Sequence, residues 1–166
     1  ISMRGTVKGD FTVAPVKAMT MEAYHEQPDV IFVCVKSYSL EDAIELVKRT
    51  GSSKTVVIPI LNIYGTGERM QKELPAVTVT DGCIYVAAYV SAPGEITHGG
   101  DIFRVVYGLR PGQKTSDAVM EKLSQIKRDC DHAGISGEYT DHVRRDTFQK
   151  FMYTSPMAAA GEYYHA

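Results

Sequence analysis

The chain has 166 residues and a formal net charge of -2, from 18 basic and 20 acidic residues. At this length it can bury a sizeable core, as one domain or as one domain with part of another, since domains commonly run to about 100–150 residues. The charges are mixed along the sequence without a block of one sign, which argues against a nucleic-acid partner or a polybasic contact with a membrane.

Three cysteines, Cys34, Cys83 and Cys130, lie far apart in the sequence. Their odd number and wide spacing favour neither a disulfide framework nor a metal site, and a reducing compartment fits them better. No apolar stretch approaches the roughly 18 residues that a membrane helix needs, and residues 1–5 lack the apolar core of a signal peptide. We therefore expect a soluble, cytoplasmic protein with no metal site.

The first 28 residues predict one short strand, at residues 9–15. Pro15 cannot donate a backbone hydrogen bond, so this strand is expected at the edge of a sheet. Nothing in this region resembles the glycine-rich turn of a dinucleotide-binding fold. We therefore expect the chain to begin inside a domain.

A strand–helix–strand unit follows. Residues 29–36 form a short apolar, β-branched run, which predicts a strand buried on both faces as in a parallel sheet. Apolar residues recur with helical spacing from residue 40, with Ser39 as the expected N-cap and Gly51 at the end. Residues 55–61 predict the next strand.

Polar side chains follow both of these strands. Lys36 lies at the end of the first predicted strand, and Asn62 directly follows the second. In open α/β sheets, ligands bind beyond the carboxyl ends of the strands. We therefore expect Lys36 and Asn62 to face one crevice.

The α/β alternation continues with a helix that ends before Pro75 and a short strand at residues 77–80. Two longer arms, residues 83–92 and 95–108, are rich in Val, Ile, Tyr and Thr and flank the turn signal Pro93-Gly94. These arms predict an antiparallel extension of the sheet.

The last third of the chain predicts two helices. The first begins at Ser116 and ends at Gly134, with apolar side chains on one face. Residues 135–141 are interpreted as a linker, and the last, long helix is expected from Asp141. On this helix, Lys150 has apolar neighbours that would desolvate its ammonium group and lower its pKa.

Five stretches of the chain, taken in order, carry a family resemblance: residues 9–18, Val33-Cys-Val-Lys-Ser-Tyr38, Pro59-Ile-Leu-Asn-Ile-Tyr-Gly65, Pro93-Gly94 with Ile96-Thr-His98, and Arg144-Arg-Asp-Thr-Phe-Gln-Lys150. Together they resemble the ketopantoate reductases, the NADPH-dependent 2-dehydropantoate 2-reductase family. The resemblance implies an α/β fold: an incomplete Rossmann-like NADP-binding domain with the antiparallel extension over residues 1–140. Residues 141–166 would then be the first helix of an all-α second domain.

The family begins with a strand and a GxGxxG turn that holds the cofactor pyrophosphate at a helix N-terminus. That unit is absent from these 166 residues. We therefore interpret the chain as a middle segment of the family's length, and expect the segment alone to be inactive.

The resemblance also implies roles for individual residues. Lys150 matches the family's proton-donating, substrate-binding lysine, and Lys36 matches a lysine that contacts the NADPH cofactor. Asn62 matches an asparagine that touches both cofactor and substrate, and Ala88 a position whose backbone meets the cofactor. Where the family often places a substrate-binding asparagine four residues after its lysine, this chain has Thr154, whose hydroxyl could take over that contact.

Several of the polar residues also have a purely structural interpretation. Without the resemblance, Lys36 reads as a solvated residue at a strand end and Asn62 as a turn residue. An unperturbed histidine titrates near neutral pH and so invites a catalytic role, yet the place of His98 beside two glycines in a predicted strand arm favours a structural role.

The resemblance thus implies that the full-length protein is an NADPH-dependent reductase of a 2-oxo acid, 2-dehydropantoate, on the route to pantothenate and coenzyme A. Two alternatives stay open: a reductase of another 2-oxo acid on the same scaffold, and a cofactor-binding or dimer-forming protein without turnover. A homodimer is compatible with either interpretation, and the choice of NADPH over NADH rests on the resemblance alone.

Overall fold

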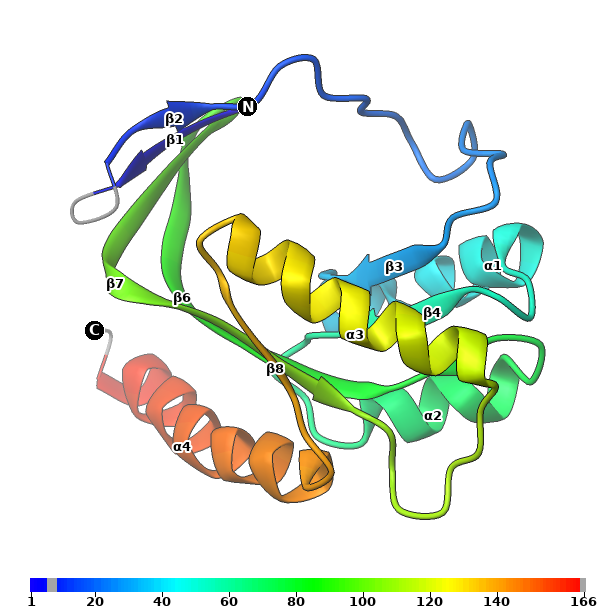
Figure 1. The fold of residues 1–166 in the computed structure, drawn as a ribbon. Coiled ribbons are helices and arrows are strands. Elements are labelled where there is room, and N and C mark those ends of the chain that lie inside the picture. Colours follow the sequence, from blue (N-terminus) through cyan, green and yellow to red (C-terminus); the bar gives the residue numbers. More distant parts are fainter. Residues whose placement is uncertain (6–8, 165–166) are drawn as a thin grey trace.

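The structure, a computed structural model, describes residues 1–5 and 9–164 of the chain. Its elements in chain order are β1 (Ser2–Gly5), β2 (Phe11–Thr12), β3 (Val30–Val33), the 3-10 turn η1 (Ser37–Ser39), α1 (Leu40–Thr50), β4 (Val56–Pro59), α2 (Thr66–Glu73), β5 (Thr78–Val79), β6 (Asp81–Ala92), β7 (Glu95–Gly108), α3 (Asp117–His132), β8 (Ser136–Tyr139) and α4 (Val143–Tyr164). After the antiparallel pair β1–β2, parallel strands with intervening helices are followed by a long antiparallel hairpin, so the predicted mixed α/β class is confirmed (Figure 1).

The strands form two sheets that meet at one point. β3, β4 and β5 make a parallel sheet in that order, and the second sheet runs β2-β1-β7-β6 with β8 also paired to β7. The backbone N–H of Thr80 donates to the carbonyl of Val57 at 2.9 Å, where β5 leads into β6. The short β5 thereby connects the parallel sheet to the antiparallel hairpin.

Two hydrophobic clusters lie on opposite faces of β4. On one face Val57 packs with the apolar sides of α1 and α2, including Ile44 and Met70. On the other face Val56 and Ile58 pack with α3 and β7. β4 is therefore the central strand, and all four of its residues are buried.

The prediction that the strand within residues 29–36 is buried on both faces is wrong. In the part of the chain that the structure describes, β3 pairs with β4 alone and forms the edge of its sheet. Phe32 is 39% exposed, whereas Val33 is buried. An apolar run indicates a strand but does not give its place in the sheet order, and β4 takes the central place.

The boundaries of α1 and α3 follow the predicted signals with one correction, and α4 begins at Val143 rather than at the expected Asp141. Ser39 is the N-cap of α1 but makes no side-chain capping bond, because η1 leads into the helix and the Ser39 N–H donates to the carbonyl of Lys36. The cap of α3 is confirmed: the Ser116 hydroxyl accepts from the N–H of Val119 at 3.3 Å. Gly134 follows this helix with a φ of 72°, a left-handed conformation that glycine adopts without strain.

The predicted antiparallel extension is confirmed as the β6–β7 hairpin, whose turn places Gly94 at a φ of 79°. Two strands that run parallel to β7 add to it: β1, which was not predicted, and β8. The interpretation of residues 135–141 as a linker is therefore wrong, since Ser136–Tyr139 form a strand. The predicted strand at residues 9–15 shortens to β2.

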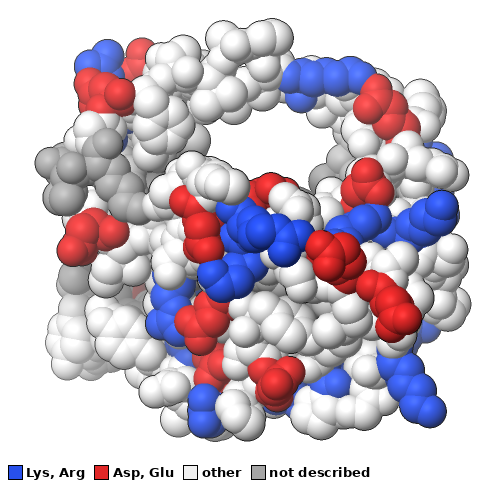
Figure 2. Space-filling view, viewed as in Figure 1, with Lys and Arg blue, Asp and Glu red and all other residues white. Residues whose placement is uncertain are grey.

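α4 packs against β6 and β7 through its first half, where Val143, Thr147 and Lys150 are buried, and it continues through Pro156. Residues 13–29 connect β2 to β3 as a mostly exposed segment that arches over an opening in the molecule (Figures 1 and 2). Acidic and basic side chains are interspersed over the face in Figure 2. Among the described residues, no helix is both long and apolar enough to cross a membrane.

Candidate active site

A cleft of about 520 Å³ lies beyond the carboxyl ends of β3 and β4. Its lining includes Lys36 and Ser37 after β3, Asn62 after β4, and Ala88 on β6. The carboxyl ends of β3 and β4 thus meet at one edge of the sheet, as predicted. Lys36, Asn62 and Ala88 line the same cleft. The side chain of Lys36 is exposed at this cleft.

Lys150 reaches the same region from α4. It is only 7% exposed, and its ammonium group donates to the Asn62 side-chain oxygen at 2.9 Å and to the carbonyl of Ile84. The ring of Tyr85 lies beneath it, with its centroid 5.2 Å from the Lys150 nitrogen. A buried lysine is rare unless its charge is satisfied, and here two oxygens and an aromatic face surround it.

Burial sets the electrostatics of this lysine. Loss of water contact lowers the pKa of Lys150 from its ordinary 10.5, and only the thiolate form of the neighbouring Cys83 would oppose that shift. Burial in turn raises the pKa of the Cys83 thiol, so that it stays protonated and uncharged near neutral pH. The lowered pKa expected from the apolar neighbours of Lys150 agrees in direction with this structure.

Asn62 connects Lys150 to the cleft. Its side chain lines the 520 Å³ cleft and also a small gap of about 10 Å³ that contains Lys150. Lys150 itself is not part of the cleft lining. The Lys150 ammonium therefore lies next to the cleft, bonded to the Asn62 side chain that lines it.

Thr154 lies one helical turn beyond Lys150 and lines the small gap with it. Its hydroxyl donates to the backbone carbonyl of Lys150 at 3.1 Å, so its proton is used within the helix. The oxygen lone pairs stay available as acceptors. Ala158, one further turn along, is exposed.

Sequence reasoning missed the residues that surround Lys150 on the sheet. Cys83 and Tyr85 are two residues apart on β6, so their side chains lie on the same face of the sheet. Arg104 lies on the neighbouring β7. Tyr85, Arg104 and Lys150 line a second cleft, of about 310 Å³, between the hairpin and α4. The period-two pattern of the arm identifies these side chains as one face, but only the packed structure shows that α4 covers that face.

His98 has structural contacts, as its sequence position suggests. It is fully buried, its Nε2 lies 3.2 Å from the carbonyl of Ile102, and its ring packs on Phe103 with centroids 5.6 Å apart. It lines none of the three cavities around Lys150 and Asn62.

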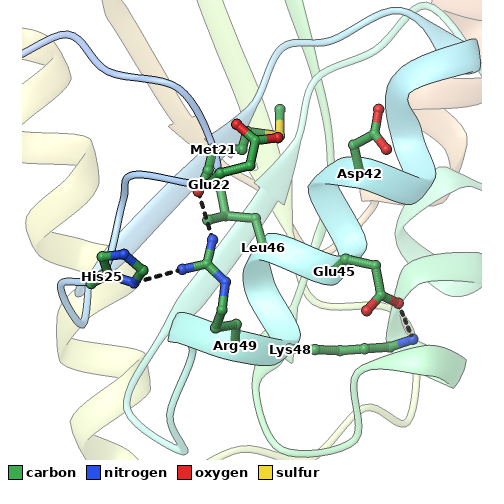
Figure 3. A pocket seen from close by; sticks show the side chains of 8 residues that line it. All are labelled: Met21, Glu22, His25, Asp42, Glu45, Leu46, Lys48 and Arg49. Carbon is green, nitrogen blue, oxygen red and sulfur yellow. Dashed lines mark hydrogen bonds and ion pairs between the residues drawn. The ribbon is translucent and has the colours of Figure 1, made fainter.

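A larger cleft, of about 580 Å³, lies elsewhere, between residues 21–25 and α1 (Figure 3). Within it, the Arg49 guanidinium donates to the carbonyls of Met21 and Tyr24 and lies 3.1 Å from His25 Nδ1. Arg49 therefore ties the chain before β3 onto α1. Its charged side chains are exposed, and Glu45 accepts from Lys48 among them, so the size of this cleft does not make it the reactive site.

The fold and the site together define a class of protein: a dinucleotide-type α/β scaffold with a buried lysine at the ligand edge of its sheet. The sequence profile described as "Ketopantoate reductase PanE/ApbA" matches residues 1–112. The chain belongs to this family.

Two curated relatives are similar to this chain in sequence. The chain is 30% identical over 134 residues to the Bacillus subtilis (strain 168) oxidoreductase YkpB, covering 80% of this chain and 42% of the relative. It is 29% identical over 154 residues to the 2-dehydropantoate 2-reductase of Aquifex aeolicus (strain VF5), covering 92% of this chain and 48% of the relative. The chain thus spans about half the length of the curated relatives it matches.

Among solved structures, the 2-dehydropantoate 2-reductase of Porphyromonas gingivalis W83 matches with a TM-score of 0.78 and 26% identity, over 99% of this chain and 55% of that chain. A ternary structure of D-mandelate dehydrogenase with NADH and anilino(oxo)acetate matches with a TM-score of 0.72 and 16% identity, over 90% of this chain and 46% of that chain. The second likeness is one of fold alone.

Proposed function

We propose that the protein containing this chain reduces a 2-oxo acid with a nicotinamide cofactor. We further propose that the substrate is 2-dehydropantoate, reduced to pantoate with NADPH on the route to pantothenate and coenzyme A. One observation carries the proposal: a buried Lys150 ammonium group is held 2.9 Å from Asn62, at the edge of the cleft where parallel strands end. Family membership and the Aquifex aeolicus relative support the choice of substrate.

The cleft suits the reactive end of a cofactor. Its volume of about 520 Å³ lies within the range of ligand pockets, roughly 300–1,000 Å³. Lys36 supplies an exposed ammonium group for a phosphate, ribose or amide oxygen, and the small side chain of Ala88 leaves the β6 backbone open to close approach. NADPH would supply the hydride when bound, while the chain positions the groups around it.

We assign to Lys150 the donation of the proton to the ketone oxygen. When a ketone accepts hydride, negative charge grows on its oxygen, and an ammonium group within hydrogen-bond reach stabilises that charge and delivers the proton. The lowered pKa of Lys150 makes its ammonium a stronger acid than a solvated lysine. Asn62 holds the donor in place and presents its own amide to the cleft, so that one side chain orients both donor and ligand.

Thr154 is assigned a substrate contact through its acceptor lone pairs, because it shares the small gap with Lys150. We also propose a domain boundary between residues 140 and 141, with α4 as the first helix of a helical second domain. In this arrangement the substrate would lie between the sheet edge and α4.

The test is turnover by the intact protein. Absorbance of NADPH is followed with 2-dehydropantoate and with a panel of other 2-oxo acids, each repeated with NADH. We expect the highest kcat/KM for 2-dehydropantoate with NADPH. A higher value for another 2-oxo acid would replace the substrate assignment, and binding of NADPH without oxidation by any member of the panel would favour the non-catalytic alternative.

A further inference from the structure

We propose that Tyr85 is a positioning residue for Lys150: the face of its ring stabilises the ammonium form of the donor from the side of the second cleft. This inference rests on the proposed function only for its catalytic consequence, because the contact itself is a property of the folded chain. Tyr85 belongs to β6 and Lys150 to α4, so the contact forms only when the helix packs on the hairpin.

The geometry is that of a cation over an aromatic face. The Lys150 nitrogen lies 5.2 Å from the ring centroid of Tyr85, within the roughly 6 Å over which the ring quadrupole attracts a cation. The guanidinium carbon of Arg104 lies 5.5 Å from the same centroid. One ring therefore serves two cations, one from a strand and one from a helix.

Arg104 is held in this position by an ion pair. Its Nε and Nη2 both donate to one carboxylate oxygen of Glu138 on β8, at 2.9 and 2.5 Å. This ion pair holds the charged guanidinium near the Tyr85 ring. Both Arg104 and Lys150 therefore lie over the ring of Tyr85.

The other groups around Lys150 do not replace the ring. Cys83 on β6 is a thiol whose pKa is raised by burial, so near neutral pH it carries no charge. Arg104 has the same sign as Lys150 and would favour the neutral amine. Asp146, four residues earlier on α4, lines the second cleft with Lys150, and its carboxylate accepts from the Thr140 hydroxyl at 3.0 Å. The Tyr85 face therefore supports the ammonium from inside the site without bringing in a negative charge.

This support matters because the site needs a protonated lysine. Burial lowers the pKa of Lys150, which favours the neutral amine over the ammonium form. A neutral amine cannot serve as the acid in ketone reduction. The ring face limits the shift while keeping water away from the donor.

The test measures the Lys150 pKa directly, by carbon NMR of the side-chain methylene next to nitrogen, in intact protein labelled at lysine. The Lys150→Met variant assigns the signal. Replacing Tyr85 by Leu removes the aromatic face, and we expect the Lys150 pKa to fall by about 0.4 to 1.5 pH units. Tyr85→Phe keeps the face and loses only the hydroxyl, so it is the matched control and should stay close to the native value.

Turnover supplies the second readout. In Tyr85→Leu the alkaline limb of kcat against pH should move to lower pH by the same amount, and in Tyr85→Phe it should not move. A Lys150 pKa that is equal in the Leu and Phe variants would overturn the proposal. If the NMR shift appears but no variant or wild type oxidises NADPH with any 2-oxo acid, the contact holds and the proposed function fails.

A shape-conserving series covers the case in which Tyr85→Leu does not fold. Phenylalanine analogues with increasing fluorine content weaken the negative ring face while keeping the side-chain volume almost unchanged. We expect the Lys150 pKa to fall stepwise with each added fluorine. A flat series would show that the ring acts by packing alone and would overturn the proposal.

Discussion

Replacing Lys150 by Met separates chemistry from stability. Methionine fills a similar volume along the same path, so the packing of α4 on the sheet is largely kept. The variant loses the ammonium and with it the proposed proton donor. We expect kcat with 2-dehydropantoate and NADPH to fall by about 10²- to 10⁴-fold, the usual contribution of a general acid, equivalent to about 3–5 kcal/mol of transition-state free energy.

The effect of this change on folding is smaller, because two opposing terms meet at this site. Asn62 and the Ile84 carbonyl each lose a charged hydrogen-bond donor, at about 1–3 kcal/mol per group. Against this, the folded chain no longer buries an ammonium group, which in proteins costs several kcal/mol. We expect the free energy of unfolding at neutral pH to change by no more than about 2 kcal/mol.

The pH dependence of stability has a defined sign. The folded pKa of Lys150 is lowered from 10.5, so between the lowered value and 10.5 the unfolded chain binds more protons than the folded chain. Stability of the native protein therefore rises with pH across that window, and the penalty is fully present below it. Lys150→Met lacks this term, so the native protein should gain stability relative to the variant as the pH rises toward 10.5.

The assay combines steady-state kinetics with urea unfolding of the same preparations. Lys127→Met, on the exposed surface of α3, is the matched control, since Lys127 pairs with Asp131 in solvent and should be neutral for turnover. Lys150→Arg should not restore activity, because a guanidinium is a poor proton donor with a different shape. Near-native kcat in a folded Lys150→Met variant would refute the assignment of the proton to this lysine.

Three further predictions each concern one side chain. Lys36→Met should raise the KM for NADPH several-fold with little change in kcat, and an unchanged KM would remove Lys36 from the cofactor site. Thr154→Val should raise the KM for the 2-oxo acid while urea unfolding stays close to native; a KM equal to that of the native protein would count against the substrate contact. Tyr107→Phe removes the buried hydrogen bond from the phenol to the Leu123 carbonyl, 2.7 Å long, and should lower the free energy of unfolding by about 1 kcal/mol, with no change in kcat.

The parts of the fold that the sequence predicts are those whose side chains repeat with a clear period. The helical spacing of α1 and α3 and the β-rich arms around Pro93-Gly94 each specify an element from local residues alone. β1 and β8 lack such a pattern: Ser-Met-Arg-Gly and Ser-Gly-Glu-Tyr have no run or alternation of apolar residues. Both become strands because β7 offers a long edge with free backbone groups, which is a tertiary cause.

The error at β3 has a related origin. The run within residues 29–36 contains the right side chains for a buried strand, but its exposure depends on which strands flank it. β4 has neighbours on both sides and helices on both faces, whereas β3 has β4 on one side only in the described chain. Sheet order comes from long-range packing, which the composition of a single strand does not encode.

The candidate site divides in the same way. Lys36 and Asn62 could be paired from the sequence, because both follow parallel strands of one predicted unit and such ends share an edge. The contact between Lys150 and Asn62 spans 88 residues, and its direction depends on how α4 lies against β6 and β7. The surroundings of Lys150, with Cys83, Tyr85 and the Ile84 carbonyl, could not be deduced from spacing for that reason.

The long-range packing around Lys150 sets the acidity and the orientation of its ammonium group. On an isolated helix Lys150 would be solvated, with an ordinary pKa and no fixed direction. Packing α4 onto the hairpin removes water and lowers the pKa, while Asn62, the Ile84 carbonyl and the Tyr85 ring keep the ammonium charged and aimed. Desolvation favours the neutral amine, whereas these contacts favour the ammonium. The acid that the proposed reaction needs requires both effects, and both arise only where α4 meets the sheet.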